Sequence, residues 1–280
     1  MLNGSIRLFR IAGIQLSVHV TFFLLLAYYA WVGWQDASQF GTTAGMIGAL
    51  SSASSVLFLF VFVILHEFGH SFAARHYGIA VPQILLLPIG GMAQMSAIPR
   101  NPWQEFVITI AGPAVNFAII GVIMIFAPFQ TEPIMAQVRG FLGLHVAVGT
   151  DTELHWPQLI MLMNLLMGCF NLIPVFPMDG GRMLRAALAS RLPYLKATFV
   201  AATIAKVLAV AGILLALFWF EPARYQTALL FGFIYFAGQT EYRMVKRREE
   251  EDARWRQMVA EQDARYTEQP PPPLPLDKTL

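Results

Sequence analysis

Long apolar segments recur along the chain, and their length restricts the fold more than any other feature of the sequence. A helix needs about 20 mainly apolar residues to cross the hydrocarbon core of a bilayer. Candidate spans lie at about residues 16–34, 52–75, 104–127, 157–174, 198–219 and 224–241. Only 13% of the residues are charged, against about 25% in soluble domains. We therefore expect an all-α polytopic membrane protein with six transmembrane helices within residues 1–241.

The distribution of charge between these spans predicts their orientation. Basic residues precede the first span, follow the last, and fill the second-to-third and fourth-to-fifth connections; they are Arg7, Arg10, Arg75, Arg100, Arg182, Arg185, Arg191, Lys196, Lys246, Arg247 and Arg248. The third-to-fourth connection instead carries Glu132, Asp151 and Glu153 beside a single Arg139. By the positive-inside rule both termini face the cytoplasm. The expected location is the inner (cell) membrane of a bacterium.

Residues 79–98, "IAVPQILLLPIGGMAQMSAI", are apolar but do not resemble a helix. Pro82, Pro88, Gly90 and Gly91 interrupt the segment, and its two arms are short enough for strands. Irregular backbone at membrane depth persists only where protein or a wet cavity satisfies its polar groups. We expect a membrane re-entrant β-hairpin or loop between the second and third helices. A loop lying on the membrane surface is the alternative.

The chain changes character after residue 241. Residues 242–268 are charged and free of glycine and proline, and the spacing of Glu250 with Arg254 and of Glu261 with Arg265 supports a helix. We expect a solvated cytoplasmic helix there. The segment "QPPPPLP" favours polyproline II, which predicts a disordered tail over 269–280. The tail is compatible with a proline-binding cytoplasmic partner and also with a plain linker end.

The segment "VFVILHEFGHSFAARH", residues 61–76, places ionisable groups inside an apolar run. Such groups are costly at bilayer depth and usually mark a functional site. His66 and His70 are four residues apart, so on a helix both imidazoles lie on one face and can bind one ion. The pattern indicates one Zn²⁺ per chain, with an open position for water, and Glu67 as the general base that takes the proton of that water.

A third ligand has to come from another part of the chain. Glu105 begins the third span in no special context, whereas Asp179 lies in "NLIPVFPMDGGR" at the cytoplasmic end of the fourth span. The second span also ends on the cytoplasmic side, so the two elements meet at similar depth. Gly180 and Gly181 permit a sharp turn that directs Asp179 inward. Asp179 as the N-cap of the following helix is the alternative.

These motifs together resemble the site-2 proteases, a family of intramembrane zinc metalloproteases. The family's HExxH and Asn-x-x-Pro-x-x-x-Asp-Gly elements match His66, Glu67, His70, Asn171, Pro174, Asp179 and Gly180. The segment "AGPAVNF" resembles the family's Gly-Pro-x-x-Asn element, and "LPIGGMAQM" its re-entrant stretch. The resemblance covers about residues 13–220. We expect a compact member, because no connection has room for a PDZ domain and the segment after 241 is too short for a CBS pair.

The resemblance implies that His66, His70 and Asp179 bind the zinc, and that Glu67 activates water to hydrolyse a peptide bond in a membrane-spanning substrate. Residues 1–241 are then the protease domain. The implied substrates are single-span membrane proteins or peptides within the lipid bilayer.

The resemblance also assigns roles around the metal. Residues 84–95, including Gly90 and Gly91, are candidates for pairing with an extended substrate by β-augmentation. Asn116 and Asn171 are implied to hold the substrate backbone or to polarise the scissile carbonyl. For each asparagine, a stabilising contact between helices is the alternative, because a buried amide needs hydrogen-bond partners in any case.

Two rival functions are a metal-binding membrane transporter and a non-proteolytic scaffold. A transporter needs a polar path, and the outer halves of the spans hold few ionisable residues; a scaffold does not need Glu67. The net charge of +2 without a basic stripe excludes a nucleic-acid partner. The single Cys169 excludes a cysteine-based zinc site and an internal disulfide framework.

Overall fold

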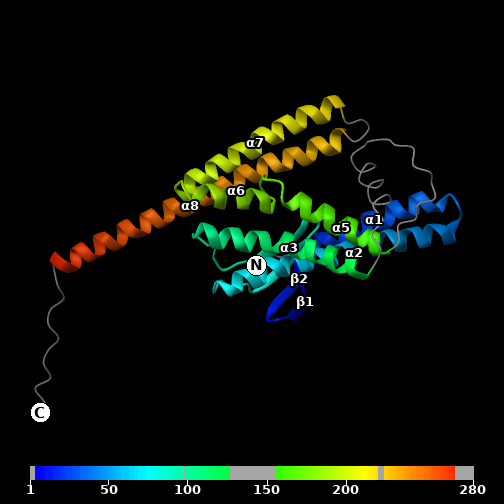
Figure 1. Ribbon diagram of the computed structural model, residues 1–280, viewed down its shortest axis with the longest axis horizontal. Helices are drawn as coiled ribbons and strands as arrows, with labels where there is room; N and C mark the ends of the chain where they lie inside the picture. The colour runs from blue at the N-terminus through cyan, green and yellow to red at the C-terminus, as the bar shows by residue number, and fades with distance from the viewer. Residues whose placement is uncertain (1–3, 98, 127–155, 220–223, 269–280) are drawn as a thin grey trace, which may run out of the picture.

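The computed structural model describes residues 4–97, 99–126, 156–219 and 224–268 (Figure 1). The predicted outer connection and the predicted proline-rich tail lie outside the described residues. The helices are α1 (Thr21–Ser38), α2 (Thr42–His76), α3 (Pro102–Phe126), α5 (Trp156–Asn171), α6 (Asp179–Ala189), α7 (Tyr194–Trp219) and α8 (Arg224–Glu268). The strands are β1 (Ser5–Ile11), β2 (Ile14–His19), β3 (Gln83–Leu87) and β4 (Gly90–Gln94).

Three helices among the described residues are long and apolar enough to cross a membrane: α2, α3 and the part of α7 at Tyr194–Phe218. Helix α5 is apolar but has only 16 residues. The expected first span at 16–34 is wrong at its start, because residues up to His19 belong to β2 and α1 begins at Thr21. The count of six spans stays a prediction.

A four-stranded sheet in the order β1-β2-β3-β4 corrects the all-α expectation. The β1–β2 and β3–β4 pairs are antiparallel and β2–β3 is parallel. The hairpin predicted within 79–98 is present as β3–β4, and its re-entrant position in a membrane stays a prediction. The β1–β2 hairpin was not expected. Its turn holds Ala12 and Gly13 at φ values of 49° and 81°, the backbone that tight hairpins of this twist require. The alternation of apolar and polar residues in "SIRLFRI" and "IQLSVH" is typical of strands and could have predicted this hairpin.

The central strands β2 and β3 form the core of the sheet. Ile14, Leu16 and Val18 of β2 and Ile84 and Leu86 of β3 are all buried. They belong to one apolar cluster with side chains of α1 and α2, among them Phe22, Phe60 and Phe68. This packing places β4 at a free edge of the sheet, next to α2.

Helix α3 is the central helix, since it packs against α2, α5 and α6. The α2–α3 crossing is close because Gly69 faces the Ala111 carbonyl oxygen, which a Cβ at residue 69 would approach to 2.5 Å. Helices α7 and α8 run side by side, and α7 also packs on α6 (Figure 1). Helix α8 is continuous through the expected boundary between residues 241 and 242.

Two polar residues lie in surroundings that the sequence did not indicate. Arg185, counted above among the cations of a cytoplasmic connection, is only 1% exposed. Glu105, judged to have no special context, is fully buried and forms an ion pair with Arg185. The judgement on Glu105 was wrong because its partner is 80 residues away in the chain and the two meet only when α3 packs on α6.

Candidate metal centre

Two histidines from α2 and one aspartate from α6 meet in the interior. His66 Nε2 and His70 Nε2 are 3.1 Å apart. Asp179 Oδ2 lies 3.2 Å from His66 Nε2 and 3.1 Å from His70 Nε2. The exposed fractions of the three residues are 4%, 4% and 7%. The structure thus brings the three predicted ligands together at one point.

Each imidazole is oriented through its other ring nitrogen by α3. His66 Nδ1 lies 2.6 Å from Asn116 Oδ1, and His70 Nδ1 lies 2.8 Å from the carbonyl oxygen of Ile108. Both partners are acceptors, so each Nδ1 carries the proton and donates it. Each Nε2 therefore presents a lone pair to the common point, as histidine ligands of metals do.

Asn116 is itself held by a residue that the sequence reasoning missed. Its Nδ2 donates to Asn164 Oδ1 at 2.9 Å, and Asn164 Nδ2 donates to the Ile160 carbonyl oxygen at 2.9 Å. Both asparagines are fully buried. The available signal was a lone amide in the apolar run "MLMNLLMG" of α5, since such an amide needs a partner. The chain of amides ties α5 to the orientation of His66.

Asp179 reaches the histidines from the first residue of α6. Met178 precedes the helix in extended conformation, so Met178 and not Asp179 occupies the N-cap position. A Cβ on Gly180 would lie 2.2 Å from the Ile173 carbonyl oxygen. The absence of that Cβ lets the Leu172–Met178 connection fold tightly over the start of α6 and turn Asp179 toward α2.

The donor set fits a zinc ion. Two imidazole lone pairs and a carboxylate oxygen around one point repel each other unless a cation lies between them. Two histidines and one carboxylate are a common ligand set of catalytic zinc, which leaves one position for water. The buried surroundings and the two oriented Nδ1–H groups supply the supporting interactions that such ligands need.

Glu67 lies beside this group and is held by the sheet. Its Oε2 accepts a hydrogen bond from the Ala93 backbone N–H at 2.9 Å. Gly91 packs so closely that a Cβ there would lie 2.5 Å from Glu67 Cγ. The free edge of β4 therefore faces the carboxylate of Glu67, a residue that is 9% exposed. Gly90, the first residue of β4 after the turn at Pro88 and Ile89, has φ of 136° and does not contact Glu67 in this way.

Gly112 of α3 is a further residue of the site. A Cβ at this position would lie 2.3 Å from His70 Nε2 and 2.8 Å from His66 Nε2. Only a residue without a side chain lets α3 approach the ligand nitrogens. The sequence motif "AGPAVNF" contained Gly112, but reasoning from the resemblance assigned a role to Asn116 alone.

The side-chain hydrogen bond of Asn171 does not involve any of the three predicted ligands. At the end of α5, it donates through Nδ2 to the Met167 carbonyl oxygen at 3.0 Å. This bond lies within α5, so it is not the contact between helices given above as the alternative, and the role of Asn171 stays a prediction. Asn116 contacts His66, so its position fits an orienting role toward a ligand.

Comparison with known proteins supports the same assignment. The model of Peptidase family M50 matches residues 54–219. A zinc metalloprotease of Methanocaldococcus jannaschii is 39% identical over 245 residues, which are 88% of this chain and 62% of that protein. A putative zinc metalloprotease of Synechocystis is 33% identical over 190 residues, 66% of this chain and 44% of that protein. The chain thus spans less than two thirds of the length of these relatives.

A solved structure has the same fold. The site-2 protease from Methanocaldococcus jannaschii superposes with a TM-score of 0.55 and 38% identity, covering 85% of this chain and 95% of that one. The chain is an integral membrane protein and belongs to Peptidase family M50. The family resemblance seen in the sequence is confirmed. Family membership implies Zn²⁺, and His66, His70 and Asp179 form a group that could hold it.

The first prediction concerns Gly112. The substitution Gly112→Ala should abolish zinc binding while the protein stays folded, because the new methyl group occupies the space before both Nε2 atoms. Zinc content of the purified protein and competition with a chelator measure this. Gly121→Ala on the same helix is the matched control, since a Cβ there meets nothing within 4 Å. Full zinc occupancy of the Gly112 variant would contradict the geometry.

The second prediction concerns Asn116. Asn116→Ala removes the acceptor of the His66 Nδ1–H group. Loss of such a supporting interaction typically lowers metal affinity by about 10–100-fold, and we expect a loss in this range by chelator competition. If Asn116 acted on substrate alone, zinc affinity would be unchanged and only hydrolysis would suffer.

The third prediction concerns Gly91. Gly91→Ala should displace the Glu67 carboxylate without touching the three ligands. If Glu67 acts as the predicted general base, a misplacement of about 1 Å can cost on the order of 10²-fold in rate, so we expect any peptide hydrolysis to fall by about that factor with zinc content unchanged. Gly232→Ala, where a Cβ meets nothing within 4 Å, is the control. Unaltered turnover by the Gly91 variant would show that Glu67 is not positioned by β4.

Proposed function

We propose that this chain is an intramembrane zinc metalloprotease, which hydrolyses peptide bonds within or near the transmembrane segments of membrane-anchored substrates. The observation that carries the proposal is the buried group of His66, His70 and Asp179 with Glu67 held beside it. The names of the relatives, zinc metalloprotease and site-2 protease, describe those proteins as proteases, which supports the proposal.

In this proposal His66, His70 and Asp179 hold one Zn²⁺ per chain. Bound there, the ion would supply a Lewis acid that brings the pKa of water from 15.7 to about 7. Glu67 Oε2 is occupied by the Ala93 N–H, which leaves Oε1 to take the proton of the attacking water. As the water oxygen bonds to the scissile carbonyl carbon and the carbon–nitrogen bond breaks, Glu67 passes that proton to the leaving amine.

The free edge of β4 is the proposed docking strand for the substrate. A peptide bond inside a helix is shielded, so the substrate has to unwind before it can be cleaved. An extended segment can add to an edge strand through main-chain hydrogen bonds. Gly90, where a Cβ would meet nothing within 4 Å, leaves room beside β4, and Gly91 brings the strand close to Glu67. Asn171, half-buried at the end of α5, remains a candidate contact for the substrate backbone.

We further propose the six-span topology with both termini in the cytoplasm, in the inner membrane of a bacterial cell. His70 lies six residues before the end of α2 at His76, a rise of about 9 Å. With that end cytoplasmic, the active site lies in the cytoplasmic half of the bilayer. The tail over 269–280 is then available to a cytoplasmic partner.

The rival reading is a metal-binding transporter or a non-proteolytic scaffold. Neither function needs a carboxylate beside the ligands, yet Glu67 is held there by the Ala93 N–H and closely packed by Gly91. This arrangement favours hydrolysis.

The fourth prediction tests the assignment of roles. Glu67→Gln keeps the size of the side chain but removes the base, so it should retain zinc and lower the cleavage rate by about 10²–10⁴-fold. Asp179→Ala should lose both zinc affinity and activity. The measurement is cleavage of a model single-span substrate by detergent-purified protein, with and without a zinc chelator. Wild-type protein that binds zinc and leaves a panel of such substrates intact would favour the rival reading.

A further inference from the structure

A buried ion pair links α6, which carries Asp179, to α3, which orients the two histidines of α2. Arg185 of α6 donates from Nε to Glu105 Oε1 of α3 at 2.9 Å, and its Nη2 contacts the same oxygen. Its Nη1 donates to Glu241 of α8. Arg185 and Glu105 are 1% and 0% exposed, whereas Glu241 has a side chain that is 21% exposed. The Arg185–Glu105 contact is therefore the desolvated part of the network.

Aromatic rings enclose the guanidinium. Arg185 Cζ lies 5.3 Å from the centroid of the Phe176 ring and 5.2 Å from that of Tyr194. The Tyr194 hydroxyl donates to Glu105 Oε1 at 3.4 Å. Burial lowers the pKa of Arg185, but the nearby carboxylates outweigh this effect and raise the pKa above its ordinary value. The guanidinium stays charged and cannot leave its partner without exposing an unpaired buried charge.

Both helices that this pair joins carry parts of the metal centre. On α3, Glu105 comes three residues before Ile108, whose carbonyl oxygen accepts from His70 Nδ1. On α6, Arg185 comes six residues after Asp179, the third ligand. The pair is thus a buried, charged contact between α6 and α3 that bears on how the two helices pack. Helix α3 orients the two imidazoles and α6 carries Asp179. The distance from Asp179 to the imidazoles therefore depends on how α6 packs on α3.

We infer that Arg185 is a positioning residue for the metal centre: through Glu105 it holds α6 against α3 so that Asp179 reaches His66 and His70. The inference rests on the proposed function for the identity of the ion. It goes beyond that function in giving a role to an ion pair that touches neither metal nor substrate. Loss of Arg185 should directly lower the affinity for Zn²⁺, and it should affect substrate hydrolysis only through the loss of zinc.

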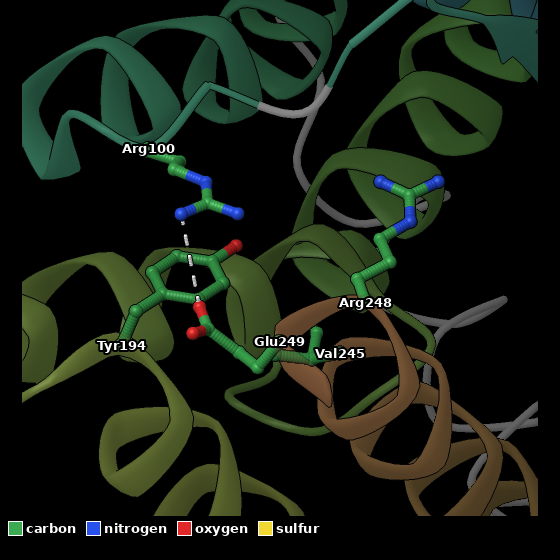
Figure 2. A pocket seen from close by; sticks show the side chains of 5 residues that line it. All are labelled: Arg100, Tyr194, Val245, Arg248 and Glu249. Carbon is green, nitrogen blue, oxygen red and sulfur yellow. Dashed lines mark ion pairs between the residues drawn. The ribbon is translucent and has the colours of Figure 1, made fainter. Parts of the chain in front are cut away.

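An exposed ion pair nearby offers a contrast. Figure 2 shows Arg100 and Glu249 beside the Tyr194 ring, in a surface pocket also lined by Val245 and Arg248. The Arg100–Glu249 distance is 3.9 Å, and the Arg100 side chain is 64% exposed. Exposed pairs of this kind contribute little, because water and salt screen them. Arg100 is therefore a suitable charge-removal control on the same side of the molecule.

The fifth prediction is that Arg185→Met lowers affinity for Zn²⁺ by about 10–100-fold, the range typical of lost supporting interactions around a metal. The full-length, detergent-purified protein is titrated with Zn²⁺ against a chelator below its unfolding temperature. Arg100→Gln should leave the affinity unchanged. Phe22→Ala, which removes a buried ring packed on Phe60 at 4.6 Å, controls for lost stability and should lower the unfolding midpoint while retaining zinc affinity.

A second variant tests whether Arg185 acts through its partner. Glu105→Gln keeps an acceptor for the guanidinium and removes the charge, so it should remain folded and weaken zinc binding in the same direction. In the double variant the loss should be smaller than the product of the two single losses, because both changes break one contact. If Arg185→Met does not fold, Glu105→Gln alone provides the test.

Unchanged zinc affinity in Glu105→Gln, or a loss in Arg185→Met no larger than in a Phe22→Ala protein of equal thermal stability, would overturn the inference. The result is independent of whether the protein cleaves peptides. If wild-type protein binds zinc but hydrolyses nothing, the proposed protease function fails while the positioning role is still measured by metal affinity.

Discussion

The mutual approach of two imidazole nitrogens and one carboxylate oxygen is the constraint on which the rest of the structure depends. These acceptors lie 3.1–3.2 Å apart in a buried site, an arrangement that is unfavourable without a cation. Helix α3 makes it possible. Gly112 leaves room for the ring nitrogens, and Asn116 and the Ile108 carbonyl orient the rings. The Arg185–Glu105 pair then brings α6, and with it the third ligand, against the same helix.

The small sheet has a comparable role for the base. Glu67 is adjacent to a ligand in the chain, yet its carboxylate is held by Ala93 of β4. Strand β4 depends on β3, and β3 depends on β2, whose apolar residues share the cluster over α1 and α2. The N-terminal strands therefore contribute to catalysis, in the proposed function, by holding the edge that faces Glu67. A purely helical bundle would offer the substrate no such edge.

The parts of the site that could be predicted from the sequence are those with local or motif-level signals. His66 and His70 share a face because of helical periodicity, and the proline and glycine residues at 82–91 predicted a hairpin that the structure contains. The residues that were missed depend on partners distant in the chain. Glu105 was judged to have no special context and Arg185 was counted only among the basic residues of a connection, since nothing within either segment indicates the other. Asn164 and Gly112 were missed because their roles follow from which helices pack together.

The sequence by itself determined the chemistry: a pair of histidines with a glutamate in an apolar helix, an aspartate before two glycines, and apolar lengths that require a membrane. Tertiary structure alone decided how these parts cooperate. It brought Asn116 into hydrogen-bond contact with His66, placed Glu67 at the edge of β4, and buried an ion pair between α3 and α6. The physical reason is that residue identity and spacing set what a side chain can bind, whereas distances between helices depend on packing that no local pattern records.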